Sequence, residues 1–389
     1  MSLVCLLAGA GTIRAAEGEY AVIITGIAHF DNRSLALLEI TGPSPRSTMT
    51  RPILAPGERM GQVEVTQIDE ANSLVRVSND GAETTFNLSG DTTVPRRTFQ
   101  FKDASLGQVL EIFQQLTGST VLAPDNLPGE KFSLSTVSLS KDDARRELEA
   151  ALRSKGIETQ DRGGKFVFAV QPRDTTVLAE IRELPTPAAG DEIFPAGLIK
   201  FASADLSQVM EIYQELSGRT ILRSGSLPPT KITVRSQREA SRTETIWMMD
   251  ALFAINGVRM IPEGEKFVFA LQNSPDVNPP TIAPEAASMP AKEGANLPPG
   301  ALKWLNADAS AILQVFASLV GREAAPIEAS IPALRLTFRT QQSLTPSEAV
   351  FALNALAALN RFKFAAEGER SVKLISTAEA RRRTLLTAP

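Results

Sequence analysis

The chain has little of the chemistry that enzymes and metal sites most often use. Its 389 residues include one cysteine, Cys5, and one histidine, His29. A lone cysteine cannot close an internal disulfide, and two such ligands are too few for a zinc site. A Cys–His pair or a Ser-His-Asp triad would have to use His29. We therefore expect no metal site, no cofactor and no catalytic residue.

The chain also lacks the surface chemistry that holds nucleic acids. Aromatic residues make up 6% of it, and its formal net charge is −4. Binding to phosphates rests on a cationic surface, and stacking on bases rests on exposed aromatic rings. We therefore expect no nucleic acid partner.

Long apolar runs are missing as well. The apolar run at residues 3–13 is shorter than the roughly 20 residues that a transmembrane helix needs. We interpret residues 1–16 as a signal-like segment with cleavage near Ala16, and we expect an exported, periplasmic protein that is peripheral to the membrane. No Lys or Arg precedes the run, and a buried N-terminal segment is the alternative.

What the sequence does contain is an internal repeat with an offset of 100 or 101 residues. The matching pairs are FKDASL and FASADL (101–106 and 201–206), VLEIFQ and VMEIYQ (109–114 and 209–214), and KFVFA twice (165–169 and 266–270). A third, more diverged copy follows. The positions that define the repeat are Phe101, Phe201 and Trp304 at the first strand, and Gly118, Gly218 and Gly321 after the first helix. Such periodicity predicts several copies of one structural unit.

Each copy predicts the same order of elements. After a first strand, apolar residues at helical spacing predict a helix, which Gly118 ends in the first copy. Two strands, a second helix beginning near Ser140, and a hairpin across residues 161–164 follow. The order β-α-β-β-α-β-β is typical of a two-layer α/β sandwich.

The predicted fold class is therefore α+β, with three repeated βαββαββ modules after a small all-β domain. We place the all-β domain at 19–90 and the modules at 97–172, 198–273 and 301–376. Pro-rich linkers occupy 173–197 and 274–300, and a basic tail occupies 377–389. Pro-rich polar stretches are typical of extended spacers, so we expect the third module to move independently of the second.

The modules resemble the small N-terminal domains of secretins, the outer-membrane rings of type II secretion and type IV pilus systems. The resemblance rests on Phe101, Asp103, Ala104 and Leu106 at the first strand and helix, and on the helix end at Gly118. The second copy repeats this pattern. Only residues 377–389 follow the third module, so we expect the chain not to be the secretin pore.

The N-terminal domain is similar to the periplasmic homology region of the inner-membrane partners of secretins. The matching segments are ITGI (24–27), LAPGE (54–58) and VTQI (65–68). That resemblance implies a small β-structure that docks on a secretin's first N-terminal domain.

One helix of the second module is richer in apolar residues than a single buried face requires. Trp247, Met248 and Met249 belong to it, and they form either a core stripe or an exposed docking patch. We take them as the candidate docking patch.

Together these features predict a non-enzymatic periplasmic scaffold or adaptor of a secretin-type machine that acts by protein–protein docking. The expected partners are a secretin, another secretion or pilus component, or another copy of the chain; no small-molecule substrate is expected. The alternatives are a standalone periplasmic receptor for a ligand or peptide and an enzyme that acts on the cell wall.

Overall fold

The computed structural model describes residues 12–13, 20–30, 33–42, 47–70, 72, 74–87, 98–137, 141–274, 276–280, 289–327, 331 and 335–378. Cys5, most of the signal-like segment and most of the basic tail lie outside the described residues. The described part is an α+β protein with seven α-helices and many small sheets. It forms two compact units. The first holds the described residues up to Thr175 with Pro195–Ile199 and Val234–Glu239; the second holds Thr176–Phe194, Lys200–Thr233 and the described residues from Ala240 onward.

The N-terminal part of the first unit is built from strands. They are β1 (Thr12–Ile13), β2 (Ala21–Phe30), β3 (Arg33–Thr41), β4 (Met49–Thr50), β5 (Ile53–Leu54), β6 (Arg59–Met60), β7 (Val63–Asp69), β8 (Leu74–Asn79) and β9 (Ala82–Asn87). Strands β6 to β9 form one sheet, and β2 and β3 belong to another. Apolar side chains from both sheets, such as Ile24 and Val75, share one buried core. The alternation of apolar residues in the sequence reflects this one-sided burial.

The rest of the first unit mixes helices with strands. Its elements are β10 (Thr98–Ser105), α1 (Leu106–Thr117), β11 (Thr120–Leu122), β12 (Lys131–Val137), α2 (Lys141–Ser154), β13 (Glu158–Arg162) and β14 (Phe166–Val170). Strand β14 lies between β11, which is parallel to it, and β13, which is antiparallel. Strand β10 pairs antiparallel with β12. Both helices contribute to the core, where Phe113 and Leu148 are fully buried.

Helix α1 begins and ends where the sequence predicts. The Ser105 hydroxyl accepts from the Gln108 amide, which satisfies a free N–H of the first turn. Gly118 follows the helix in the left-handed conformation at φ 68°, and its amide donates to the Gln114 carbonyl. A residue without a Cβ adopts this conformation at little cost, so the prediction for Gly118 is confirmed.

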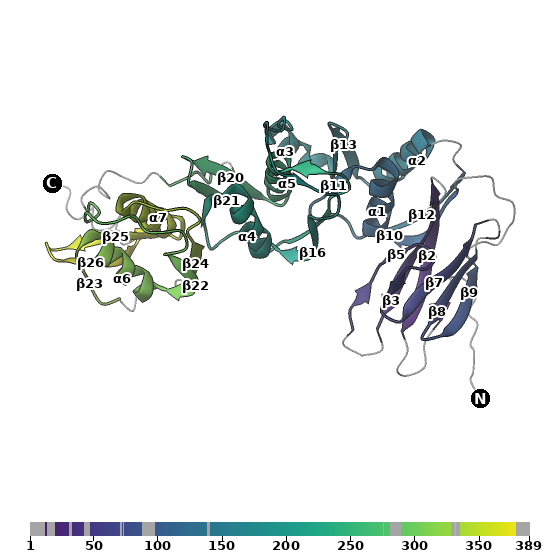
Figure 1. Cartoon of the computed structure of the whole chain (residues 1–389), viewed down its shortest axis with the longest axis horizontal. Helices are drawn as coiled ribbons and strands as arrows, with labels where there is room; N and C mark the ends of the chain where they lie inside the picture. Colours follow the sequence, from purple (N-terminus) through teal and green to yellow (C-terminus); the bar gives the residue numbers. More distant parts are fainter. Residues whose placement is uncertain are drawn as a thin grey trace. The chain divides into compact units, whose positions relative to one another are not determined.

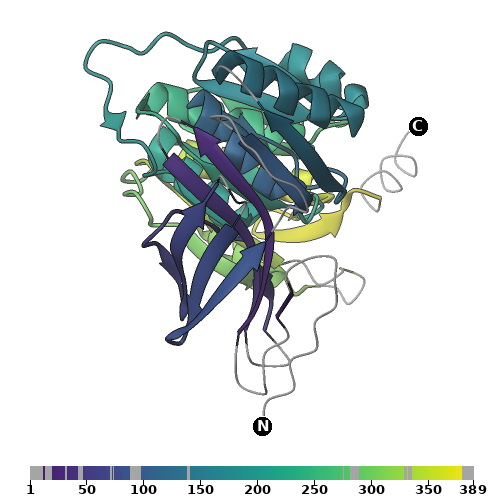
Figure 2. The ribbon, with the colours of Figure 1, turned by 90° about the vertical axis from the view of Figure 1, so that its right-hand side faces the viewer.

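One sheet joins the N-terminal strands to the segment that begins at residue 98. Strand β2 pairs antiparallel with β10, with Phe101 opposite Gly26 and Phe99 opposite Ala28. The sheet order is β12-β10-β2-β3-β4. The purple and blue strands in Figures 1 and 2 belong to this part of the chain. The sequence predicted two separate domains here. Local periodicity does not reveal a ladder between strands about 70 residues apart.

Two further groups of elements follow, and they lie in the second unit except for Thr175, Val234 and Arg235. The first group is α3 (Thr175–Glu180), β15 (Ile193–Phe194), β16 (Lys200–Asp205), α4 (Leu206–Ser217), β17 (Thr220–Arg223), β18 (Lys231–Arg235), β19 (Ala240–Ser241), α5 (Arg242–Ile255), β20 (Val258–Glu263) and β21 (Phe267–Gln272). The second is β22 (Lys303–Asp308), α6 (Ala309–Val320), β23 (Glu323–Ala324), β24 (Arg335–Arg339), α7 (Pro346–Leu359), β25 (Phe362–Glu367) and β26 (Ser371–Ser376). The main sheets have the orders β16-β18, β17-β21-β20, β22-β24 and β23-β26-β25.

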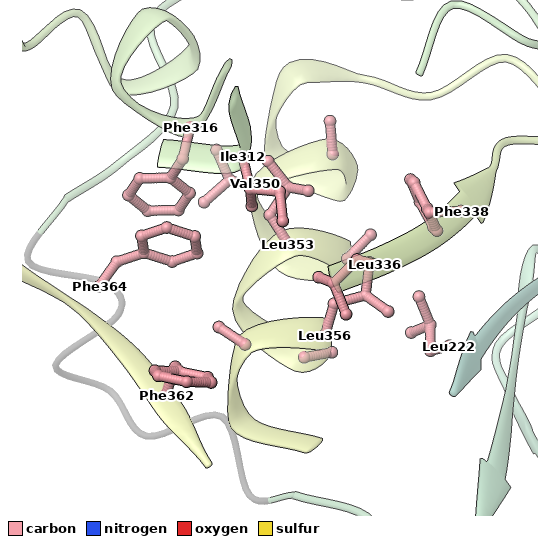
Figure 3. Close-up of a cluster of buried hydrophobic side chains, with 14 of the residues drawn as sticks. Leu222, Ile312, Phe316, Leu336, Phe338, Val350, Leu353, Leu356, Phe362 and Phe364 are labelled. Atoms are coloured by element: carbon pink, nitrogen blue, oxygen red, sulfur yellow. The ribbon is translucent and has the colours of Figure 1, made fainter. Parts of the chain in front are cut away.

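These two groups share one hydrophobic core. Leu222 and Phe267 of the first group belong to the same buried cluster as Phe316 and Phe364 of the second. The rings of Phe316 and Phe364 stack with centroids 3.8 Å apart (Figure 3). This differs from the independent movement that the Pro-rich segment 274–300 led us to expect.

The two Pro-rich segments contact the folded elements. Segment 173–197 contains helix α3, whose Leu178 is buried. In segment 274–300, Met289 joins the core, and the Lys292 amide donates to the Leu319 carbonyl at 2.7 Å. The apolar residues between the prolines bury surface, so these segments differ from the extended spacers predicted from composition.

Candidate docking site

The candidate docking patch on α5 is wrong, because its residues are buried. Trp247 is 6% exposed, and Met248 and Met249 are 1% or less exposed. The Trp247 indole donates to the Arg182 carbonyl at 2.8 Å. Segment 173–197 therefore covers the side of α5 that the sequence analysis took as a possible exposed patch. Burial on several sides explains why α5 has more apolar residues than one face needs.

The strands that begin the three predicted modules differ in how they are paired. Strand β10 has neighbours on both edges, β12 and β2. Within the described residues, β16 pairs only with β18, and β22 only with β24. Two strands at corresponding positions in the repeat therefore keep an edge whose N–H and C=O groups can pair with another strand.

Pairing changes the burial of the residue that defines the repeat. Phe101 on β10 is 3% exposed and shares a core with Leu35 and Leu37 of β3. Phe201 on β16 and Trp304 on β22 remain partly exposed. The N-terminal sheet thus completes an apolar surface that the other two strands leave partly open.

A groove lies beside β22 in the second unit. It has a cavity volume of about 260 Å³. Its walls come from α4, β17, β22, β24 and the residue Gln341; they include Met210, Ile221, Trp304 and Leu305. Leu305 is 80% exposed, which is unusual for a large apolar side chain. A second hollow of about 310 Å³ shares Ser207, Arg223 and Thr337 with the groove.

The charged side chains of the groove are mostly basic. Arg223, Lys303 and Arg339 line it, against the single acid Glu211. Arg339 is 3.4 Å from the exposed Glu215, and such an exposed ion pair contributes little to stability. Burial lowers the pKa of Arg223, while Glu211 raises it in part. Arg223 forms no salt bridge within the described part of the chain. The excess of basic over acidic side chains in the lining therefore favours an acidic ligand.

A titratable pair lies elsewhere in the second unit. Burial raises the pKa of Asp250 to about 6, against the lowering effects of its hydrogen bond with Tyr213 and the charges of Arg182 and Arg219. Burial also raises the pKa of Tyr213. Neither residue lines the groove beside β22.

Neither a cluster of metal ligands nor a membrane-spanning helix occurs in the described residues. No group of three His, Cys, Asp or Glu side chains there could hold a metal ion. His29, the only histidine, lies on β2. None of the helices described is long and apolar enough to cross a membrane.

Comparison with known proteins leaves the family open. No protein-family model matches the chain, and no curated protein matches it significantly. The resemblance to secretin N-terminal domains and to their inner-membrane partner therefore stays a prediction.

Proposed function

We propose that the chain is a non-enzymatic scaffold that holds protein partners through the edges of its β-sheets. The observation that carries this proposal is the ladder between β2 and β10. Through it, a sheet edge of one folded part already serves as the docking surface for another. Strand addition supplies affinity through backbone hydrogen bonds, and the flanking side chains supply specificity.

The proposal includes three copies of one module. In its support, β10-α1-β11-β12-α2-β13-β14 has the same order as the elements from β22 to β26, and the elements from β16 to β21 differ only by the added β19. Each copy pairs its first strand with its fourth element and places its last strand between two others. Phe113, Tyr213 and Phe316 each occupy the eighth position of the first helix and are buried.

An unusual backbone position recurs in the three first strands. Asp103, Ser203 and Asn306 all have φ between 54° and 56°. Each donates its amide to a hydroxyl on the paired strand, at 3.1 to 3.2 Å; the acceptors are Ser133, Thr233 and Thr337. A left-handed residue is strained outside glycine, so its recurrence with the same type of partner supports a common module.

The joints between elements also repeat. In the first unit the Gln237 amide donates to the Thr120 hydroxyl, and in the second unit the Gln341 amide donates to the Thr220 hydroxyl, both at 3.0 Å. The next side chains, Arg238 and Gln342, donate to the carbonyls of Gly118 and Gly218. Each loop thus contacts a helix end in the same way, which suits a scaffold assembled from serial units.

We further propose a place and partners for this scaffold. The signal-like segment supports export to the periplasm, and the resemblance to secretin domains supports work in a type II secretion or type IV pilus machine. The partner is then a secretin, another component of that machine, or another copy of the chain.

The test is cross-linking in the native envelope. A chromosomally tagged chain is cross-linked in intact cells, purified, and its partners are identified by mass spectrometry, with an untagged strain as the control. We expect the chain in the periplasmic fraction and a secretin or its machine among the partners. Recovery as an uncross-linked monomer would contradict the proposal, as would turnover of a cell-wall substrate that a single carboxylate substitution abolishes.

A further inference from the structure

We propose that the free edge of β22 binds an extended strand from a partner protein in which acidic and apolar side chains alternate. The proposal rests on the proposed docking function and names the site and the chemistry of its partner. The groove beside β22 would receive one face of that strand.

The chain itself contains the precedent for this mode of binding. At the corresponding strand of the first predicted module, β2 adds antiparallel to β10 beside the repeat position Phe101. The equivalent residue on β22 is Trp304, which is partly exposed and contacts Phe338 at a ring-centroid distance of 5.5 Å. A strand added to β22 would cover Trp304 as β2 and β3 cover Phe101.

The two faces of the β22–β24 pair explain why the partner should alternate. Lys303 lies opposite Arg339, and Trp304 lies opposite Phe338. Successive side chains of a strand point to opposite faces of a sheet. One face therefore carries Lys303 and Arg339, and the other carries the two aromatic rings; Leu305 lies at the register shift that follows Trp304. A matching strand places acidic side chains on the first face and apolar side chains on the second.

The groove, which residues of both faces line, supplies charge complementarity. Its lining has three cations, Arg223, Lys303 and Arg339, and one acid, Glu211. Arg223 is largely withdrawn from water, and burial lowers its pKa, so a carboxylate brought close to it would relieve that cost. Complementary charge of this kind selects the partner and speeds its encounter.

The test uses a defined probe, a short fluorescent peptide in which isoleucine alternates with glutamate. Binding is followed by anisotropy and by hydrogen exchange of the β22 amides in the full chain. We expect saturable binding with slower exchange across Lys303–Asp308. A peptide with lysine in place of glutamate and a peptide with methylated backbone amides should both bind at least tenfold more weakly.

Two kinds of variant distinguish loss of the binding site from loss of folding. Arg339→Glu changes an exposed charge and should weaken binding about tenfold. Leu305→Pro places a residue without an N–H on the β22 edge and should abolish binding. The matched control is Ala202→Pro, the equivalent position on β16, which should leave binding at β22 unchanged.

Unaltered binding in both Arg339→Glu and Leu305→Pro would overturn this proposal, as would the absence of protection in the β22 amides. Failure of the peptide to bind, with a secretin still recovered by cross-linking, would remove this site and leave the proposed function intact. Peptide binding without any envelope partner would keep the site and remove the proposed function.

Discussion

At the scale of single residues, Asp250 carries a charge that the folded core disfavours. Its pKa rises from 3.8 to about 6, chiefly because of burial. Folding thus favours the protonated acid, so the stability that Asp250 contributes is fully present below its unfolded pKa. That stability is lost as the pH rises through about 6.

We predict that Asp250→Asn stabilises the chain near neutral pH. Asparagine keeps an acceptor for Tyr213 and has no charge to desolvate. The free energy of unfolding should rise by up to about 3 kcal/mol at neutral pH and change little near pH 4. Urea unfolding of the parent and the variant at several pH values measures this difference.

Glu149 provides the matched control for this prediction. It occupies the same position of α2 that Asp250 occupies in α5, but it is paired with Arg145 at 2.7 Å. Glu149→Gln removes a partly exposed ion pair and should slightly destabilise the chain at neutral pH. A difference between Asp250→Asn and its parent that stays constant with pH would contradict the assigned cause.

At the scale of elements, the end of α1 depends on its left-handed glycine. A Cβ at Gly118 would lie 3.3 Å from the Arg238 guanidinium, and φ is +68°. We predict that Gly118→Ala lowers the free energy of unfolding by about 1–2 kcal/mol, through backbone strain. Thermal unfolding with far-ultraviolet circular dichroism measures the effect.

Gly107 in the same helix is the control for that substitution. A Cβ there meets no atom within 4 Å, and the backbone is helical. Gly107→Ala should therefore raise stability, by up to about 1 kcal/mol, since alanine is the better helix former. Equal destabilisation by both substitutions would show that added bulk, rather than backbone conformation, decides the result.

At the same scale, the local sequence pattern did not predict which apolar surfaces stay exposed. Apolar richness alone pointed to α5 as a surface, whereas Leu305 on a short strand is the residue left 80% exposed. Exposure depends on which neighbours cover an element, and segment 173–197 covers Trp247. The local sequence pattern predicts a helix or a strand, but it does not predict which other elements cover it.

At the scale of the whole molecule, the shared core sets which parts unfold together. We predict that Phe316→Ala destabilises the second unit by about 3–5 kcal/mol, because a fully buried ring leaves a cavity. Hydrogen exchange should then accelerate across α4–β21 as well as α6–β26, since Leu222 and Phe267 share that core. Exchange in α1 and β14 should stay unchanged.

Phe113→Ala is the reciprocal experiment. Phe113 is fully buried in the core of the first unit. Phe113→Ala should lower the free energy of unfolding of the first unit by a similar amount. Hydrogen exchange should then accelerate in α1 and β14 and stay unchanged in the second unit. If Phe316→Ala acted only within residues 303–376, the third predicted module would be independent after all.

The sequence by itself determined many of the elements and several of their ends. Apolar spacing predicted helix α1, the recurring FKDASL and KFVFA segments predicted corresponding strands, and Gly118, Gly218 and Gly321 predicted where three helices end. These features depend on contacts between residues close in the chain. Hydrogen bonds, caps and side-chain alternation within one element leave a readable local pattern.

Only the tertiary structure decided what covers each element. It paired β2 with β10, buried Trp247 beneath segment 173–197, merged Leu222 with the core around Phe316, and left β22 with an open edge and a basic groove. Each of these outcomes joins residues far apart in the chain. Because a β-strand edge offers the same N–H and C=O groups to any strand, the choice of neighbour depends on the assembled surfaces.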